Sequence, residues 1–85
     1  MYLEHEFEYI INHAGHPIGY VEGQAVLHAW GMIDFDWKIS EVWLLDADSR
    51  KLFKIDPETS LGKEITEWLY QREADRIEEH IVLEA

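Results

Sequence analysis

Apolar and polar side chains alternate along the first segment of the chain, residues 2–11. One face of this segment carries apolar residues and one histidine: Leu3, His5, Phe7, Tyr9 and Ile11. The other face carries three carboxylates, those of Glu4, Glu6 and Glu8. A period of two residues with one apolar face predicts a β-strand that packs on a core with one face and meets solvent with the other.

Three further segments are predicted as strands. Residues 12–17 contain Gly15 and Pro17 and predict a turn. Residues 18–30 follow as a second strand, and the run from Ala25 is apolar on both faces, so this strand is expected to be central. Gly23 within it indicates a bulge or a close approach of backbone. Residues 39–45 and 51–55 predict the third and fourth strands, with the polar turn 46–50 between them.

The C-terminal part of the chain is rich in helix-forming residues. Asp56 and Pro57 are typical of a helix start, and Ser60 would cap a slightly later one. We therefore expect a helix over residues 57–80. The predicted fold is α+β, with one domain over residues 1–85. In it an antiparallel four-stranded sheet is followed by one long C-terminal helix packed on a face.

The predicted helix carries two apolar stripes instead of one. The first contains Leu61, Ile65 and Trp68, and the second, on roughly the opposite side, contains Tyr70, Ala74, Ile77 and Ile81. Two interpretations stay open. A kink near residues 71–73 would return the second stripe to the core of the same chain. A straight helix would instead leave the second stripe for self-association, as a homodimer or a structural scaffold.

Acidic residues outnumber basic ones by 18 to 7, and no Lys or Arg precedes Lys38. Negative charge concentrated in this way repels nucleic acid and anionic membranes and attracts basic surfaces. We therefore expect a basic protein surface as partner, with no direct binding to nucleic acid or membrane. Glu4, Glu6 and Glu8 are the predicted acidic contacts.

Residues 34–37 add aromatic side chains to this acidic pattern. Asp34 and Asp36 alternate with Phe35 and Trp37. Nucleic-acid stacking platforms combine aromatic with basic residues, so the charge here has the wrong sign for them. Aromatic anchors beside carboxylates suit a basic protein partner. The alternative is that Phe35 and Trp37 close one end of the core.

Candidate chemistry is sparse. The chain has no Cys, which excludes disulfides and thiolate chemistry and favours a cytoplasmic location. His13 and His16 have a His-x-x-His spacing, but two ligands in a Gly/Pro turn are too few for a metal site. The sequence shows no arrangement of nucleophile and base and no phosphate-binding loop. We therefore expect no enzyme activity, no metal and no cofactor. A metal binder or small enzyme that uses the histidines is a further alternative.

The stretch from Ile33 to Val42 and the acidic C-terminal helix resemble small acidic proteins encoded by bacteriophages and prophages. The resemblance implies a compact antiparallel sheet before a helix, and a location in the cytoplasm of the host cell. Several such proteins inhibit a host enzyme by occupying its nucleic-acid site, as some anti-CRISPR proteins and other DNA mimics do. Together with the charge, this implies a non-enzymatic acidic binding protein and, in the specific form, an inhibitor that mimics DNA.

Overall fold

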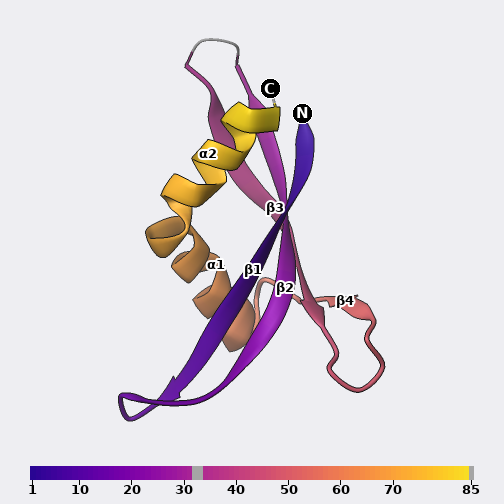
Figure 1. The fold of residues 1–85 in the computed structure, drawn as a ribbon, viewed down its shortest axis with the longest axis vertical. Coiled ribbons are helices and arrows are strands. Elements are labelled where there is room, and N and C mark those ends of the chain that lie inside the picture. Colours follow the sequence, from indigo (N-terminus) through magenta and orange to yellow (C-terminus); the bar gives the residue numbers. More distant parts are fainter. Residues whose placement is uncertain (32–33, 85) are drawn as a thin grey trace.

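The computed structural model describes residues 1–31 and 34–84, and it shows a four-stranded antiparallel sheet followed by two helices (Figure 1). The elements are β1 (Tyr2–His13), β2 (His16–Trp30), β3 (Asp36–Leu45), β4 (Leu52–Lys54), α1 (Ser60–Arg72) and α2 (Ala74–Glu84). The strands lie in the order β1-β2-β3-β4. The α+β class and the antiparallel sheet are confirmed. Met32 and Ile33, in the predicted connection, lie outside the described residues.

The two longest strands form a hairpin through a two-residue turn at Ala14 and Gly15. The φ angles of these residues are 52° and 82°. Positive φ at both central positions gives a turn whose twist matches that of the flanking strands. The predicted turn over residues 12–17 is thus shorter than expected, and His13 pairs with His16 directly beside it.

The core lies between one face of the sheet and the two helices. Its buried members come from β1, β2, β3 and both helices: Phe7, Ala25, Leu27, Ala29, Val42, Leu44, Ile65, Leu69, Ile77 and Ile81. A Cβ at Gly23 would overlap the carbonyl oxygen of Trp43 and the Phe7 ring. The absence of a side chain at Gly23 therefore lets the Phe7 ring cross β2, as the predicted close approach requires.

The prediction of one long helix is wrong. Helix α1 ends at Arg72, and the residue after it, Glu73, has φ and ψ angles of −106° and 1°, which leave the helical region. Helix α2 then begins, and its first bond runs from the Ile77 N–H to the Glu73 carbonyl. The change of direction turns the second apolar stripe back onto the sheet, because Ile77 and Ile81 would otherwise face away from it.

The start of the helical region also differs from the prediction. Helix α1 begins at Ser60, and the side chain of Thr59 accepts a hydrogen bond from the Gly62 N–H at 3.1 Å. Asp56 instead accepts a bond from the Glu58 N–H, which closes a turn ahead of the helix. The Asp56 side chain therefore bonds an N–H ahead of the helix and none within it. The N-cap is Thr59, and neither Asp56 nor Ser60 has that role.

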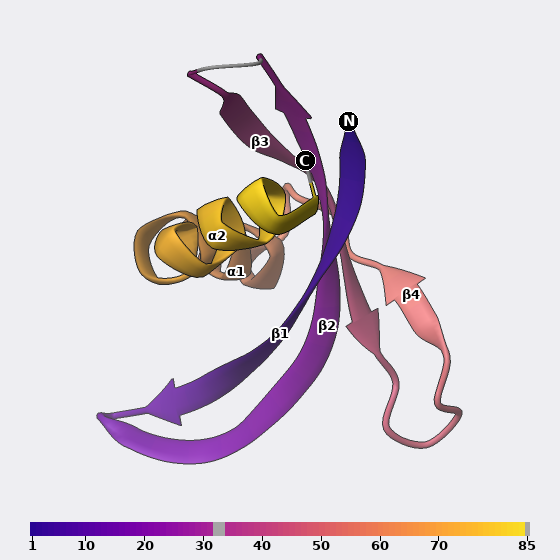
Figure 2. The same ribbon diagram turned by 45° about the horizontal axis from the view of Figure 1, so that its top comes forward.

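Both helices lie on one face of the sheet, and in the described part of the chain no helix covers the other face (Figure 2). Strand β4 and the loop before it bend toward this uncovered side. Within the described residues, neither helix combines the length and apolar character that crossing a membrane needs. We call the uncovered surface the open face.

Candidate functional site

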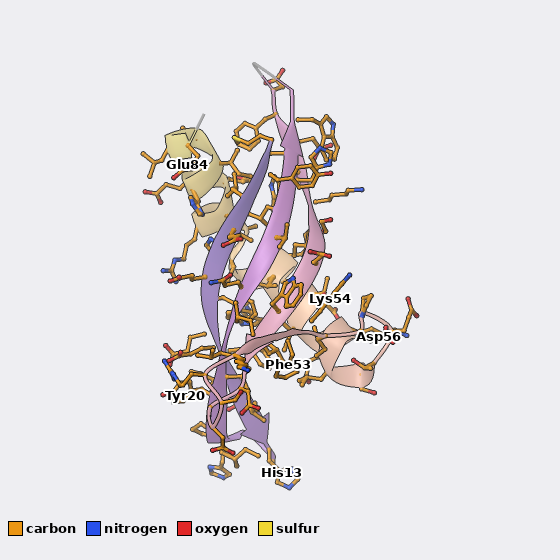
Figure 3. The ribbon with its side chains drawn as sticks, turned by 90° about the vertical axis from the view of Figure 1, so that its right-hand side faces the viewer. His13, Tyr20, Phe53, Lys54, Asp56 and Glu84 are labelled. Atoms are coloured by element: carbon orange, nitrogen blue, oxygen red, sulfur yellow. The ribbon has the colours of Figure 1, made fainter. Side chains whose placement is uncertain are left out.

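The open face carries the outward side chains of all four strands (Figure 3). Strand register places these side chains in rows across the sheet. The rows are Tyr2–His28–Lys38, Glu4–Val26–Glu41, Glu6–Gln24–Trp43–Lys54, Glu8–Glu22, Leu45–Leu52 and Ile10–Tyr20. The face therefore has an acidic side on β1 and a mixed side on β3 and β4.

The acidic side consists of four carboxylates, which we call the acidic strip: Glu4, Glu6, Glu8 and Glu22. All four residues are exposed, and Glu8 lies directly opposite Glu22. Alternate residues of a strand are about 6.8 Å apart, so the three carboxylates of β1 form a regular line. Like charges opposite each other in a sheet cost roughly 0.2–1 kcal/mol. The acidic strip therefore lowers the folding stability of the chain.

No cation of the described residues pairs with the acidic strip. The ion pairs join Lys54 to Glu41, Arg76 to Glu73 and His80 to Glu84. Arg50, in the turn before β4, lines the same hollow as Glu6, Glu8 and Glu22 without forming an ion pair with them. The negative charge of the strip is consequently available to an external partner.

Aromatic side chains stand at both ends of the strip. At one end the Tyr2 ring stacks on the His28 ring with 4.4 Å between centroids, and His28 lies 5.3 Å from Trp30. At the other end Tyr20 is 60% exposed. Large aromatic rings with one exposed face supply contact area at low entropic cost. The carboxylates thus have potential anchors on either side.

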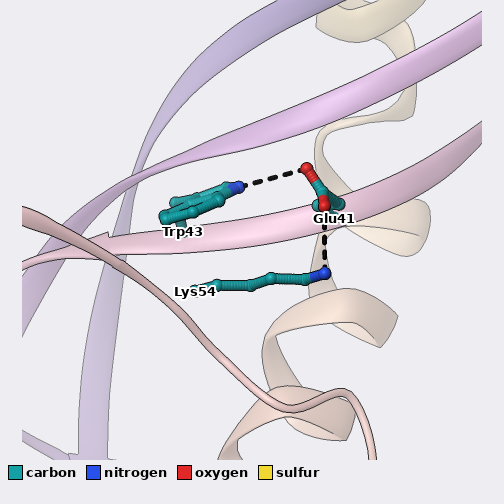
Figure 4. A network of polar contacts seen from close by, with 3 residues as sticks. All are labelled: Glu41, Trp43 and Lys54. Carbon is teal, nitrogen blue, oxygen red and sulfur yellow. Dashed lines mark hydrogen bonds and ion pairs between the residues drawn. The ribbon is translucent and has the colours of Figure 1, made fainter.

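On the opposite side of the open face, the carboxylate of Glu41 is neutralised within the chain. Lys54 Nζ lies 2.9 Å from Glu41 Oε2, and the Trp43 indole N–H donates to Glu41 Oε1 at 3.4 Å (Figure 4). The hydrogen bond from Lys54, with that from Trp43, holds the pKa of Glu41 below its usual value. Glu41 is thus satisfied within the chain, in contrast to the glutamates of β1.

The four residues predicted as an acidic aromatic loop are divided by the structure. Asp34 and Asp36 are exposed, and Asp36 pairs with Trp30 at the far end of β2. Phe35 and Trp37 instead pack against the core. The Trp37 indole N–H donates to Glu78 at 3.2 Å, and its ring stacks on Tyr70 at 5.3 Å. Phe35 and Trp37 therefore close one end of the core, as the alternative interpretation of residues 34–37 expected.

The residues predicted for self-association do not form one surface. Ile77 and Ile81 are fully buried in their own core, and Ala74 is half-buried. Tyr70 is 41% exposed, and its hydroxyl accepts a hydrogen bond from the Ile39 N–H at 2.8 Å. The straight helix on which the predicted seam depended is absent from the described residues, so the seam loses its physical basis.

The histidines lie in two separate places. His13 and His16 face each other as strand partners beside the exposed hairpin turn. His5 is buried on the helix side, with its Nδ1 atom 3.4 Å from Nδ1 of His80. Burial lowers the pKa of His5; His80 and Arg76 add to this effect, and Glu73 opposes it. Within residues 1–31 and 34–84, no three His, Asp or Glu side chains gather as metal ligands.

An open hollow of about 740 Å³ extends along both sides of β1. Glu6, Glu8 and Glu22 line it on the open face, whereas Trp68 and Glu73 line it on the helix side. Because β1 pairs only with β2, these two sides meet at the free edge of β1. The edge of the sheet is therefore accessible beside the acidic strip.

Several residues of the open face were not singled out from the sequence as site residues. They are Tyr2, Tyr20, Glu22, His28 and Trp43. Their even or odd position along a strand places each on one side, but pairing between strands decides which of them lie beside Glu4, Glu6 and Glu8. That Glu8 lies directly opposite Glu22 could be recognised only once the register of the β1–β2 hairpin was known.

No protein-family model matches the chain, and no curated protein or solved structure matches it either.

Proposed function

We propose that the protein is a non-enzymatic binding protein whose open face engages a basic surface of another protein. The observation that carries the proposal is the acidic strip: four exposed carboxylates on one open face, with no cation of the described chain paired to them. Clustered like charges raise the free energy of the folded chain. A basic partner would remove that cost on binding.

The arrangement of the open face supports charge-led recognition with a fixed orientation. Carboxylates without internal partners accelerate encounter with a basic surface and reject acidic ones. Tyr2 and Tyr20, exposed at opposite ends of the strip, offer apolar contacts that do not depend on salt. On the β3 side of the face Glu41 is already paired with Lys54, and Lys38 adds a positive charge, so the attraction of a basic surface is directed to β1.

The specific form of the proposal is occupation of a nucleic-acid site on a host protein. A net charge of −11 gives the chain the sign that such sites select. The resemblance to small acidic phage proteins supports the same form and a cytoplasmic location. In this form the partner is a nucleic-acid-binding protein, and duplex DNA competes with the chain for it.

The experiment is a quantitative pull-down from a bacterial lysate with three baits: wild type, Glu4→Gln/Glu6→Gln/Glu8→Gln and the control Glu58→Gln/Glu67→Gln/Glu79→Gln. Both triple variants change the net charge by three, but only the first alters β1. The proposal expects a protein retained by the wild type and the control and lost from the strand variant. DNA mimicry adds that duplex DNA releases it. Equal retention by all three baits would contradict the proposal.

A further inference from the structure

The two edges of the sheet differ in length. Strand β4 forms one edge with three residues, Leu52–Lys54. Strand β1 forms the other edge with twelve residues, Tyr2–His13. A long exposed edge presents a row of unpaired backbone donors and acceptors, which is a template for one more strand.

The backbone groups that face outward on β1 are identified by its pairing with β2. Met1 and Ala29 exchange two backbone hydrogen bonds, of 2.9 Å and 2.8 Å. Bonded and non-bonded pairs alternate in an antiparallel ladder. The register of β1 on β2 is regular up to Ile11, so the odd-numbered residues bond to β2. The N–H and C=O groups of the even-numbered residues therefore point to the free edge: Tyr2, Glu4, Glu6 and Glu8.

The same four residues place their side chains on the open face. Within the described residues, no backbone or side-chain hydrogen bond outside the β1–β2 ladder uses the main chain of Glu4, Glu6 or Glu8. The helices lie on the other face and leave this edge uncovered (Figure 2). Each outward backbone pair of β1 from Glu4 to Glu8 is thus accompanied by one exposed carboxylate.

We propose that the edge of β1 from Tyr2 to Glu8 binds an extended basic segment of the partner, which adds as a fifth strand antiparallel to β1. A Lys or Arg at every second residue of that segment lies beside Glu4, Glu6 and Glu8 on the open face. The inference rests on the proposed function, because both require a basic partner. It adds the conformation of the partner and the backbone contacts that hold it.

Charge selects this occupant over a second copy of the chain. An antiparallel pair of two β1 strands centred on Glu6 would place Glu6 opposite Glu6 and Glu4 opposite Glu8. Like charges directly opposite destabilise such a pair, and opposite charges stabilise it. The glutamates therefore protect the edge against self-pairing while they accept a basic strand. Main-chain bonds would supply affinity and the alternating side chains specificity, as in other cases of strand addition.

The test uses three synthetic eight-residue peptides in which Lys and Thr alternate. One is unmodified, one carries N-methyl groups on the amides of its Lys residues, and one carries them on the amides of its Thr residues. All three peptides have the same charge. In the antiparallel arrangement, the Lys amides face β1 and the Thr amides face solvent. Methylation of the Lys amides removes the donors that β1 requires.

We expect the unmodified and Thr-methylated peptides to bind the wild-type chain with similar dissociation constants. The Lys-methylated peptide should bind roughly tenfold or more weakly, since it loses several main-chain hydrogen bonds. Equal binding of the two methylated peptides would overturn strand addition. If those equal affinities still fall in the Glu4→Gln/Glu6→Gln/Glu8→Gln variant, the proposed function survives and only this inference fails. If the triple variant binds all three peptides as the wild type does, the proposed function fails as well.

A second pair of variants tests the edge from the side of the protein. Glu6→Pro and Glu6→Gln both remove the carboxylate, but only Glu6→Pro removes an N–H that points outward from β1. Strand addition predicts weaker peptide binding by Glu6→Pro than by Glu6→Gln, with both variants folded by circular dichroism. Equal affinity of the two folded variants would contradict it. Peptide methylation alone decides the question if Glu6→Pro does not fold.

Discussion

The two faces of β1 are built from the same strand and serve different ends. On one face Leu3, Phe7 and Tyr9 pack against the core, and Trp68 of α1 meets both the Phe7 and Tyr9 rings. On the other face Glu4, Glu6 and Glu8 are exposed and have no ion pair within the described residues. Folding stability therefore comes mainly from the covered face, while the unpaired glutamates of the open face cost stability and are free for recognition.

His5 is the polar exception on the covered face. It is buried, and its Nε2 atom has no hydrogen-bond partner in the described structure. A buried polar atom without a partner costs roughly 1–3 kcal/mol. The covered face thus also contains a side chain that is sensitive to protonation. Its neighbours in the chain, Glu4 and Glu6, instead expose their carboxylates to solvent on the open face.

The largest expected effect concerns the covered face. Ile77→Ala should lower the free energy of unfolding by about 2–5 kcal/mol, because it opens a cavity in the core. Leu83→Ala, on the same helix at a residue that is 77% exposed, should change it by no more than about 0.5 kcal/mol. Chemical denaturation measures both. Equal small effects would mean that Ile77 does not pack on its own sheet, and would restore the self-association seam.

A smaller effect is expected from pH at His5. The fold lowers the pKa of His5 below its ordinary value of 6.5, so the folded chain binds fewer protons there than the unfolded chain. Stability is therefore full above about pH 6.5 and declines as the pH falls through the lowered folded pKa. His5→Leu should remove this decline. The measurement is the difference in unfolding free energy between wild type and variant at pH 7.5 and pH 5. The wild type should lose more stability on acidification, and parallel losses would exclude His5 as the cause.

The smallest expected effect concerns the open face. Glu22→Gln should raise the unfolding free energy by about 0.2–1 kcal/mol, since it relieves the opposition to Glu8. Glu79→Gln, an exposed residue of α2, changes the net charge equally and should have a smaller effect. Thermal unfolding at low salt compares the two variants. A loss of stability in Glu22→Gln would show that the strip is stabilised by contacts other than those described.

The alternation within each strand was predictable from the sequence, whereas the helix break was not. Residues 2–11 and 18–30 sort into faces by a period of two, and the structure places the odd residues inside from Leu3 to Ile11 and from Val21 to Ala29. The two apolar stripes over residues 61–81 indicated either a kink or a second interface, and sequence alone left both open. No proline or glycine lies at the break to signal it in the sequence. The helix is interrupted only by the backbone angles of Glu73. Tertiary packing of Ile77 and Ile81 explains why the chain turns there.

The candidate site was predictable only in part. Charge and parity identified Glu4, Glu6 and Glu8 as exposed neighbours, as the structure shows. The pattern of residues 34–37 did not predict where Phe35 and Trp37 lie. Alternation of Asp with Phe and Trp fits an exposed loop and the edge of a core equally well. Trp37 is held by Tyr70 and Glu78, which are more than thirty residues away in the chain. Such long-range contacts leave no local signal.

The central claim, that the acidic strip recognises a basic partner, is tested most directly by the salt dependence of binding. The unmodified Lys-Thr peptide is titrated against wild type, Glu4→Gln/Glu6→Gln/Glu8→Gln and Glu58→Gln/Glu67→Gln/Glu79→Gln over a range of NaCl concentrations. We predict that wild type and control bind with the same affinity and the same steep decline with salt, because attraction between exposed charges is screened. The strand variant should bind more weakly at low salt and show a shallower decline. Three coincident salt profiles would contradict the account.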